Sequence, residues 1–186
     1  MHDSLPTRDL AVGALFAALI AAGALVALPM VGPVPFTLQV LFVLLAGLML
    51  GARLGALSVL AYVVAGLVAP VYAQGASGPG ALFGPAGGYL VGFVVSAYLV
   101  GWLAERWRPR RFVPLLGIAI AGLVPIYAIG AVWLALQLDA PSFHTIVWGG
   151  VLQFVPADLV KAALAALAAR ALLSLPLDLG VFSRAR

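Results

Sequence analysis

Long apolar runs, separated by short connections, dominate this sequence. Six runs approach the length of about 20 residues that a helix needs to cross a bilayer: 9–28, 36–51, 54–70, 88–105, 113–137 and 151–175. Hydrophobic residues make up 65% of the 186-residue chain and charged residues 9%, too few to cover the surface of a water-soluble domain. Backbone groups in hydrocarbon must hydrogen-bond within their own segment, and the alternating polarity of barrel strands is absent. The sequence therefore predicts an all-α membrane protein with six transmembrane helices, forming a single domain over residues 1–186.

The first run has a second interpretation, as a cleaved signal peptide. It follows Arg8 and is rich in small residues over 10–28. Five similar runs follow it, however, and a protein with several spans needs no cleaved leader. We therefore expect the run to be the first transmembrane helix.

The arginines fall in alternate connections and at the chain ends. They are Arg8, Arg53, Arg106, Arg108, Arg110, Arg111, Arg170, Arg184 and Arg186. The connections 29–35, 71–87 and 138–150 contain none. Because Lys and Arg are enriched in cytoplasmic loops, this pattern predicts that both termini are cytoplasmic. Arginines placed between apolar runs, with no polar domain to carry them, do not indicate a nucleic-acid partner.

The predicted connection between the third and fourth helices is unusually rich in glycine and proline. Over 70–88 these residues are Pro70, Gly75, Gly78, Pro79, Gly80, Gly84, Pro85, Gly87 and Gly88. Such a segment is too flexible for a helix and too apolar for a solvated linker, so we expect it to fold against the bundle. One interpretation is a lid over an outward-facing pocket, with residues 29–36 as another wall; the other is an ordinary external loop.

Two ionisable side chains lie well inside a predicted span, Asp158 and Lys161. Each costs about 2.5–3.5 kcal/mol at the centre of a membrane helix, so their presence requires a reason. Their i, i+3 spacing places them on one helical face, where they can pair and both address a ligand. The pair could instead only hold helices together. Pro156 either occupies the first helical turn or kinks the helix.

Apart from this pair, the sequence has few residues that could serve in catalysis or bind a metal. The only lysine does not follow a glycine, which excludes the phosphate-binding loop of ATPases, and no His, Cys or carboxylate cluster indicates a metal. The first run carries Ala14, Ala18 and Ala22 at four-residue spacing, beside Ala17 and Ala21. Small residues at this spacing allow another helix to approach closely, either within the protein or from a partner.

Four motifs together resemble the BioY family, the biotin-specific substrate-capture components of energy-coupling factor (ECF) transporters. They are GPVPFTLQ at 32–39, GARLG at 51–55, GPAGGYLVGF at 84–93 and PADLVK at 156–161. The resemblance implies a six-helix bundle of S-component type in the bacterial cytoplasmic (inner) membrane. It also implies docking on an ECF transmembrane coupling subunit driven by two cytoplasmic ATPase subunits. No enzymatic activity, cofactor or metal is implied for this chain.

The resemblance also implies a biotin site and a docking stripe. Asp158 can accept from the ureido N–H groups, while Lys161 can orient Asp158, donate to the ureido oxygen or meet the carboxylate. The remaining candidates are Phe36, Tyr89, Gly84 and Gly87 around the rings, and Thr37, Gln39 and Gln74 as polar groups. The family's AxxxA docking motif matches Ala14 with Ala18, and the frame of Ala17 with Ala21 stays open. A solitary biotin carrier, a membrane enzyme or assembly protein, and a homo-oligomer are the alternatives.

Overall fold

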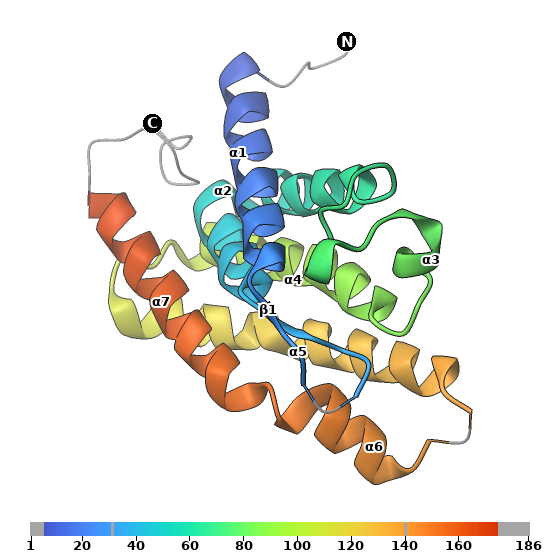
Figure 1. Ribbon diagram of the computed structural model, residues 1–186. Helices are drawn as coiled ribbons and strands as arrows, with labels where there is room; N and C mark the ends of the chain where they lie inside the picture. Colours follow the sequence, from blue (N-terminus) through green and yellow to red (C-terminus); the bar gives the residue numbers. More distant parts are fainter. Residues whose placement is uncertain (1–5, 31, 140, 175–186) are drawn as a thin grey trace.

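The computed structural model describes residues 6–30, 32–139 and 141–174, and the described chain is almost entirely helical (Figure 1). Arg184, Arg186 and the end of the last predicted span lie outside the described residues. Five helical stretches are long and apolar enough to cross a membrane. The helices are α1 (Thr7–Leu25), α2 (Gln39–Ala65), α3 (Gly78–Leu82), α4 (Gly87–Trp107), α5 (Phe112–Gln137), α6 (Phe143–Val147) and α7 (Val155–Ser174).

Helix α2 contains two of the predicted spans, 36–51 and 54–70, joined without a loop. Gly51 has φ 84° and ψ −178°, which breaks the helix into two arms that run in different directions in Figure 1. This φ lies in the region that glycine tolerates best. Gly101 of α4 packs directly on the kink, where a Cβ atom would lie 2.2 Å from the Gly51 carbonyl carbon. The Glu105 carboxylate accepts a hydrogen bond from the Ala52 N–H at 3.0 Å and so caps the second arm. The described chain therefore contains six long helical segments, as the sequence predicts.

The first helix ends at Leu25, before the predicted bound at 28, and the second begins at Gln39, after the predicted bound at 36, because residues 27–37 form a small hairpin. Strand β1 (Ala27–Leu28) pairs antiparallel with β2 (Phe36–Thr37), with Ala27 opposite Thr37 and Leu28 opposite Phe36. The prolines between the strands lack the N–H that a helix requires, so α1 ends at Leu25. The Leu38 N–H donates to the Gly23 carbonyl at 3.0 Å, which ties the start of α2 to the end of α1.

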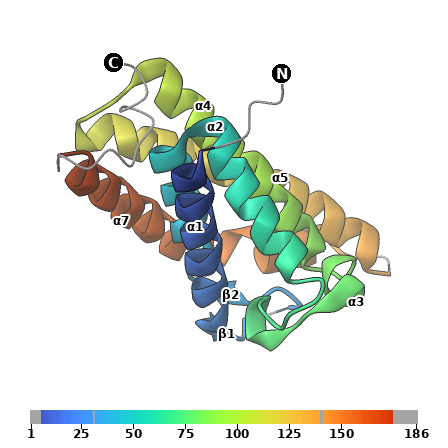
Figure 2. The ribbon, with the colours of Figure 1, turned by 90° about the horizontal axis from the view of Figure 1, so that it is seen from above.

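The connection 66–86 folds against the bundle as predicted, but it is not free of helix. It contains a 3₁₀ turn at Ala73–Gly75 and the short α3, in whose first turn Pro79 is tolerated because that N–H has no helical acceptor. The Tyr72 hydroxyl donates to the Val63 carbonyl at 2.6 Å, and the Gly78 N–H donates to the Gly66 carbonyl at 2.8 Å. Figure 2 shows the hairpin and α3 at the same end of the bundle, which we call the loop end.

The last predicted span, 151–175, also begins differently. Helix α6 leads through a π-helical turn, Trp148–Leu152, into α7. Pro156 lies in the first turn of α7, the first of the two positions that the sequence left open. Helices α4 and α5 correspond closely to the predicted spans 88–105 and 113–137.

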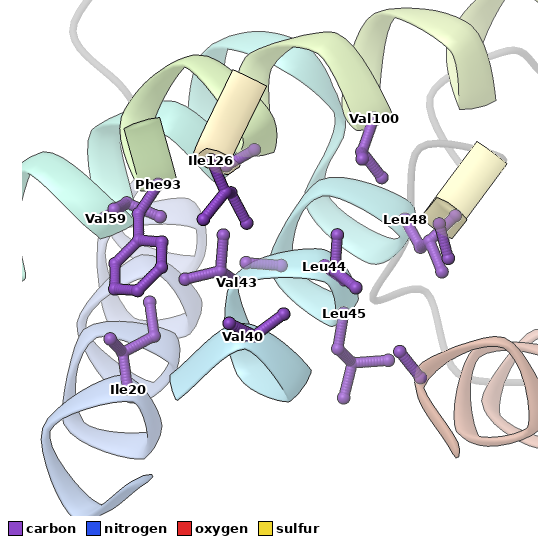
Figure 3. Close-up of a cluster of buried hydrophobic side chains, with 14 of the residues drawn as sticks. Ile20, Val40, Val43, Leu44, Leu45, Leu48, Val59, Phe93, Val100 and Ile126 are labelled. Carbon is purple, nitrogen blue, oxygen red and sulfur yellow. The ribbon is translucent and has the colours of Figure 1, made fainter. Parts of the chain in front are cut away.

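The core lies where the first arm of α2 crosses α4 and α5 (Figure 3). Val43 and Leu44 are fully buried there, and Ile20 of α1 reaches them from one side. Gly47 allows the close approach of α4, since a Cβ atom at this residue would lie 2.8 Å from the Ala97 carbonyl oxygen. This tight packing holds the two central helices at fixed positions, from which the side chains of the cavity project.

Candidate functional site

A cavity of about 270 Å³ lies at the loop end of the bundle. Its walls come from the hairpin, the start of α2, the connection 66–86, the start of α4, the middle of α5 and the start of α7. Apolar and aromatic lining residues include Val34, Tyr72, Tyr89, Leu90, Phe93, Ile126 and Phe154. Polar side chains come from Thr37, Gln39, Gln74, Tyr127, Asp158 and Lys161. A mostly apolar cavity with a few convergent polar groups is typical of a small-molecule site.

Asp158 and Lys161, in the first two turns of α7, form the polar centre of this cavity. Lys161 Nζ lies 2.6 Å from Asp158 Oδ1 and also donates to the Thr37 carbonyl oxygen at 2.6 Å. Asp158 and Lys161 are 3% and 4% exposed. The pair therefore neutralises itself, as the packing interpretation requires, and at the same time faces a cavity.

Two further groups complete this centre. The Tyr127 hydroxyl, from α5, donates to Asp158 Oδ2 at 2.7 Å. Nζ of Lys161 lies 3.7 Å from the centre of the Phe36 ring, a cation–π contact. The centre thus joins α5, α7 and the hairpin in one network of charge-assisted bonds.

The hydrogen bonds within this centre leave capacity for a ligand. An ammonium group has three donors, of which Lys161 uses two. A carboxylate has about four acceptor positions, and Asp158 uses one on each oxygen. The centre can therefore accept hydrogen bonds from a ligand and donate one to it.

A second polar group lies beside the first, at the start of α2. The Thr37 hydroxyl donates to Gln39 Oε1 at 3.0 Å, and Gln39 Nε2 donates to the Tyr62 hydroxyl at 2.7 Å. Both Thr37 and Gln39 are buried and line the cavity. These bonds fix the orientation of the Gln39 amide before a ligand arrives.

Aromatic rings form much of the remaining wall. The Tyr89 hydroxyl donates to the Gly150 carbonyl of the π-helical turn at 2.7 Å, which leaves its ring as wall. The ring packs on Gly130, where a Cβ atom would lie 2.4 Å from it. Tyr72 contributes from the connection 66–86, and burial raises the pKa of its hydroxyl, which therefore stays protonated and donates to Val63.

Seven of the nine binding residues expected from the sequence line this cavity. They are Thr37, Gln39, Gln74, Gly84, Tyr89, Asp158 and Lys161. Phe36 lies beside the Lys161 ammonium group. Gly87 packs on the Leu82 carbonyl group, which a Cβ atom would overlap. Neither of these two residues is among those that line the cavity.

Tyr127 is the main residue that sequence reasoning missed. It lies in the apolar run 113–137, from which the sequence predicts only a membrane span. The signal was present, because a phenol hydroxyl inside such a run needs a hydrogen-bond partner when it is buried. The identity of that partner depends on the contact between α5 and α7, which no local pattern reveals.

The two alanine stripes of α1 face different surroundings. Ala14, Ala18 and Ala22 are exposed, whereas Ala17 and Ala21 are partly buried and pack against the core. Helix α1 contacts chiefly α2. The first stripe is thus free for another helix, while the second is used inside the protein.

Comparisons with known proteins place this geometry in a family. The model of the BioY family matches residues 1–176. The chain belongs to the BioY family. It is 40% identical over 172 residues to "Biotin transporter BioY" of Thermotoga maritima, covering 92% of this chain and 99% of that protein. It is 38% identical to "Probable biotin transporter BioY" of Pyrococcus horikoshii, covering 90% and 98% of the two chains.

A solved structure agrees with the family assignment. The crystal structure of "the S-component for biotin from an ECF-type ABC transporter" superposes with a TM-score of 0.87 at 26% identity. The match covers 98% of this BioY chain and 100% of that one. The expected family and the all-α, S-component-type fold are thereby confirmed, and the chain is a multi-pass membrane protein.

Proposed function

We propose that this BioY protein binds biotin with high affinity and acts as the substrate-binding subunit of an ECF-type transporter. Relatives that match nearly their full length carry the name biotin transporter, and the superposed S-component is one for biotin. The observation that carries the proposal is the Asp158–Lys161 pair, buried but facing a cavity with mostly apolar walls.

The chemistry of biotin suits this centre. Biotin combines a ureido group, which has two N–H donors and one carbonyl acceptor, with an apolar fused ring and a carboxylated tail. Asp158 has unused acceptor positions for ureido N–H groups, and Lys161 has one unused donor for the ureido oxygen. The rings of Tyr89, Phe93 and Phe154 supply apolar walls for the fused rings.

The proposal extends to the assembly. The protein lies in the bacterial cytoplasmic membrane with both termini on the cytoplasmic side, which places the loop end outside. It docks on the transmembrane coupling subunit through the exposed stripe of Ala14 and Ala18. Two cytoplasmic ATPase subunits drive the coupling subunit.

Substitution of Ala18 by Trp should impair copurification with the coupling subunit and leave biotin binding intact, whereas Ala17→Trp should disturb the fold itself. Normal assembly by Ala14→Trp and Ala18→Trp would place the interface elsewhere.

The alternative of a solitary carrier differs in energisation alone. Uptake of labelled biotin by cells that express this chain, with and without the coupling and ATPase subunits, separates the two. Uptake that requires the partner subunits supports the ECF assembly.

Titration calorimetry of the detergent-purified chain tests the binding step. We expect saturable heat with biotin and none with thiamine or riboflavin. The Asp158→Asn variant should bind more weakly, whereas Ser174→Ala, at the other end of the same helix, should bind as the parent does. A folded, monodisperse protein that gives no heat with biotin would overturn the proposal.

A further inference from the structure

A second cavity, of about 510 Å³, lies at the opposite end of the bundle from the first. We call it the arginine cavity; it is lined by Arg110, Leu167, Arg170, Ala171, Leu173 and Ser174. It lies between the connection that joins α4 to α5 and the last turns of α7, which Figures 1 and 2 both place side by side. Asp158 and Arg170 are on the same helix, and their separation along its axis is about 18 Å at 1.5 Å per residue.

The charges of the arginine cavity have no counter-charge in the described chain. Arg110 and Arg170 are exposed, and neither has a hydrogen-bond or ion-pair partner among the described residues. The only carboxylate of the neighbouring described segments, 100–115 and 160–174, is that of Glu105, which caps the second arm of α2. Within the part of the chain that the structure describes, two guanidinium groups therefore share one cavity with no carboxylate between them.

The other walls of the arginine cavity are apolar. Leu167 is 48% exposed, and Ala171 and Leu173 also line the cavity. Nearby, the end of α4 presents Trp102 and Trp107, which are 50% and 64% exposed, as residues at a membrane interface often are. We therefore expect the cationic groups of the cavity to lie at the level of the lipid headgroups and its apolar walls to extend toward the hydrocarbon.

This combination fits one class of ligand. A guanidinium fork binds phosphate oxygens with two parallel hydrogen bonds, and basic pockets between transmembrane helices bind anionic lipid headgroups. A free phosphate ion would use the two charges but leave the apolar walls uncovered. We propose that the arginine cavity binds the headgroup of an anionic phospholipid, with the phosphate between Arg110 and Arg170 and an acyl chain along Leu167.

The site has a structural consequence. An anionic headgroup between the two arginines links the α4–α5 connection to the end of α7, two segments that carry charges of the same sign. Binding therefore replaces a repulsion by two attractions. Phosphatidylglycerol should stabilise the protein against thermal unfolding, while phosphatidylcholine, which has no net charge, should do so much less.

Native mass spectrometry of the full chain in detergent, titrated with phosphatidylglycerol, tests the proposal. The variant Arg110→Gln/Arg170→Gln should bind this lipid about thirtyfold more weakly, since each basic residue near an anionic surface is worth roughly a factor of five. The matched control is Arg53→Gln/Arg106→Gln, which removes the same charge from exposed arginines that do not line the cavity. The control should keep the affinity of the parent.

Three outcomes would overturn the proposal. Equal loss in both double variants would show a general effect of net charge. Equal binding of phosphatidylcholine would remove the role of the anionic headgroup, and displacement by inorganic phosphate at a similar concentration would assign the site to a free anion.

If the first double variant fails to fold, Ser174→Glu provides a second test, because it keeps both arginines and adds a competing carboxylate at the rim. It should weaken lipid binding, and unchanged binding by this variant would also contradict the proposal.

Discussion

The two cavities differ in the burial and the pairing of their charged side chains. In the cavity of the loop end, Lys161 and Asp158 are buried and paired, and a phenol and a backbone carbonyl complete their bonds. In the arginine cavity, two cations are exposed and have no paired carboxylate in the described segments of the chain. A site that supplies its own counter-charge must recognise its ligand by the geometry of hydrogen bonds. A site that lacks one must obtain the counter-charge from the ligand.

The largest effect on biotin binding is expected at Lys161. The variant Lys161→Met removes the cation and leaves the Asp158 carboxylate buried without its partner. Loss of one member of a buried pair costs about 3–5 kcal/mol, so biotin affinity should fall at least a hundredfold or the protein should lose stability. Calorimetry and thermal unfolding measure the two effects. If the parent affinity and melting temperature both persist, the pair is not the centre of the site.

A smaller effect is expected at Tyr127. The variant Tyr127→Phe deletes the hydrogen bond to Asp158 Oδ2 and keeps the ring. A hydrogen bond to a charged group contributes about 1.5–3 kcal/mol, so biotin should bind at least about tenfold more weakly. The matched control is Tyr98→Phe, because Tyr98 is 51% exposed and does not line the cavity.

A double-mutant cycle shows whether Tyr127 acts through Asp158. In an Asp158→Asn background the further change Tyr127→Phe should have much less effect, because the charged acceptor is gone. An equal effect in both backgrounds would mean that Tyr127 contributes through packing instead.

Salt concentration should distinguish the two cavities while having the smallest effect on biotin binding. Raising the salt concentration from 0.1 M to 1 M shortens the screening length from about 10 Å to about 3 Å. Binding of phosphatidylglycerol at the exposed arginines should weaken severalfold, whereas biotin affinity should change by less than about twofold, since a buried pair is screened much less. A steep salt dependence of biotin binding would show that the loop-end site is open to solvent.

The sequence predicts the parts of this molecule that depend on local composition. Apolar length identified the helical segments, and i, i+3 spacing brought Asp158 and Lys161 to one face. What it missed depends on contacts between distant segments. The loop-free kink at Gly51 depends on the close approach of Gly101, which GARLG alone does not reveal. The hairpin required pairing between residues on either side of a proline-rich turn, and the partner of Tyr127 required the packing of α5 on α7.

The bond between Lys161 and the Thr37 carbonyl has a consequence for biosynthesis. These residues are 124 positions apart in the chain, so the ribosome has made most of the protein before the hairpin can meet its partner. A nascent chain that ends before α7 holds most of its membrane helices but lacks both charges of the site. Binding of labelled biotin to chains released at successive lengths should therefore appear in one step, when the last helix is inserted.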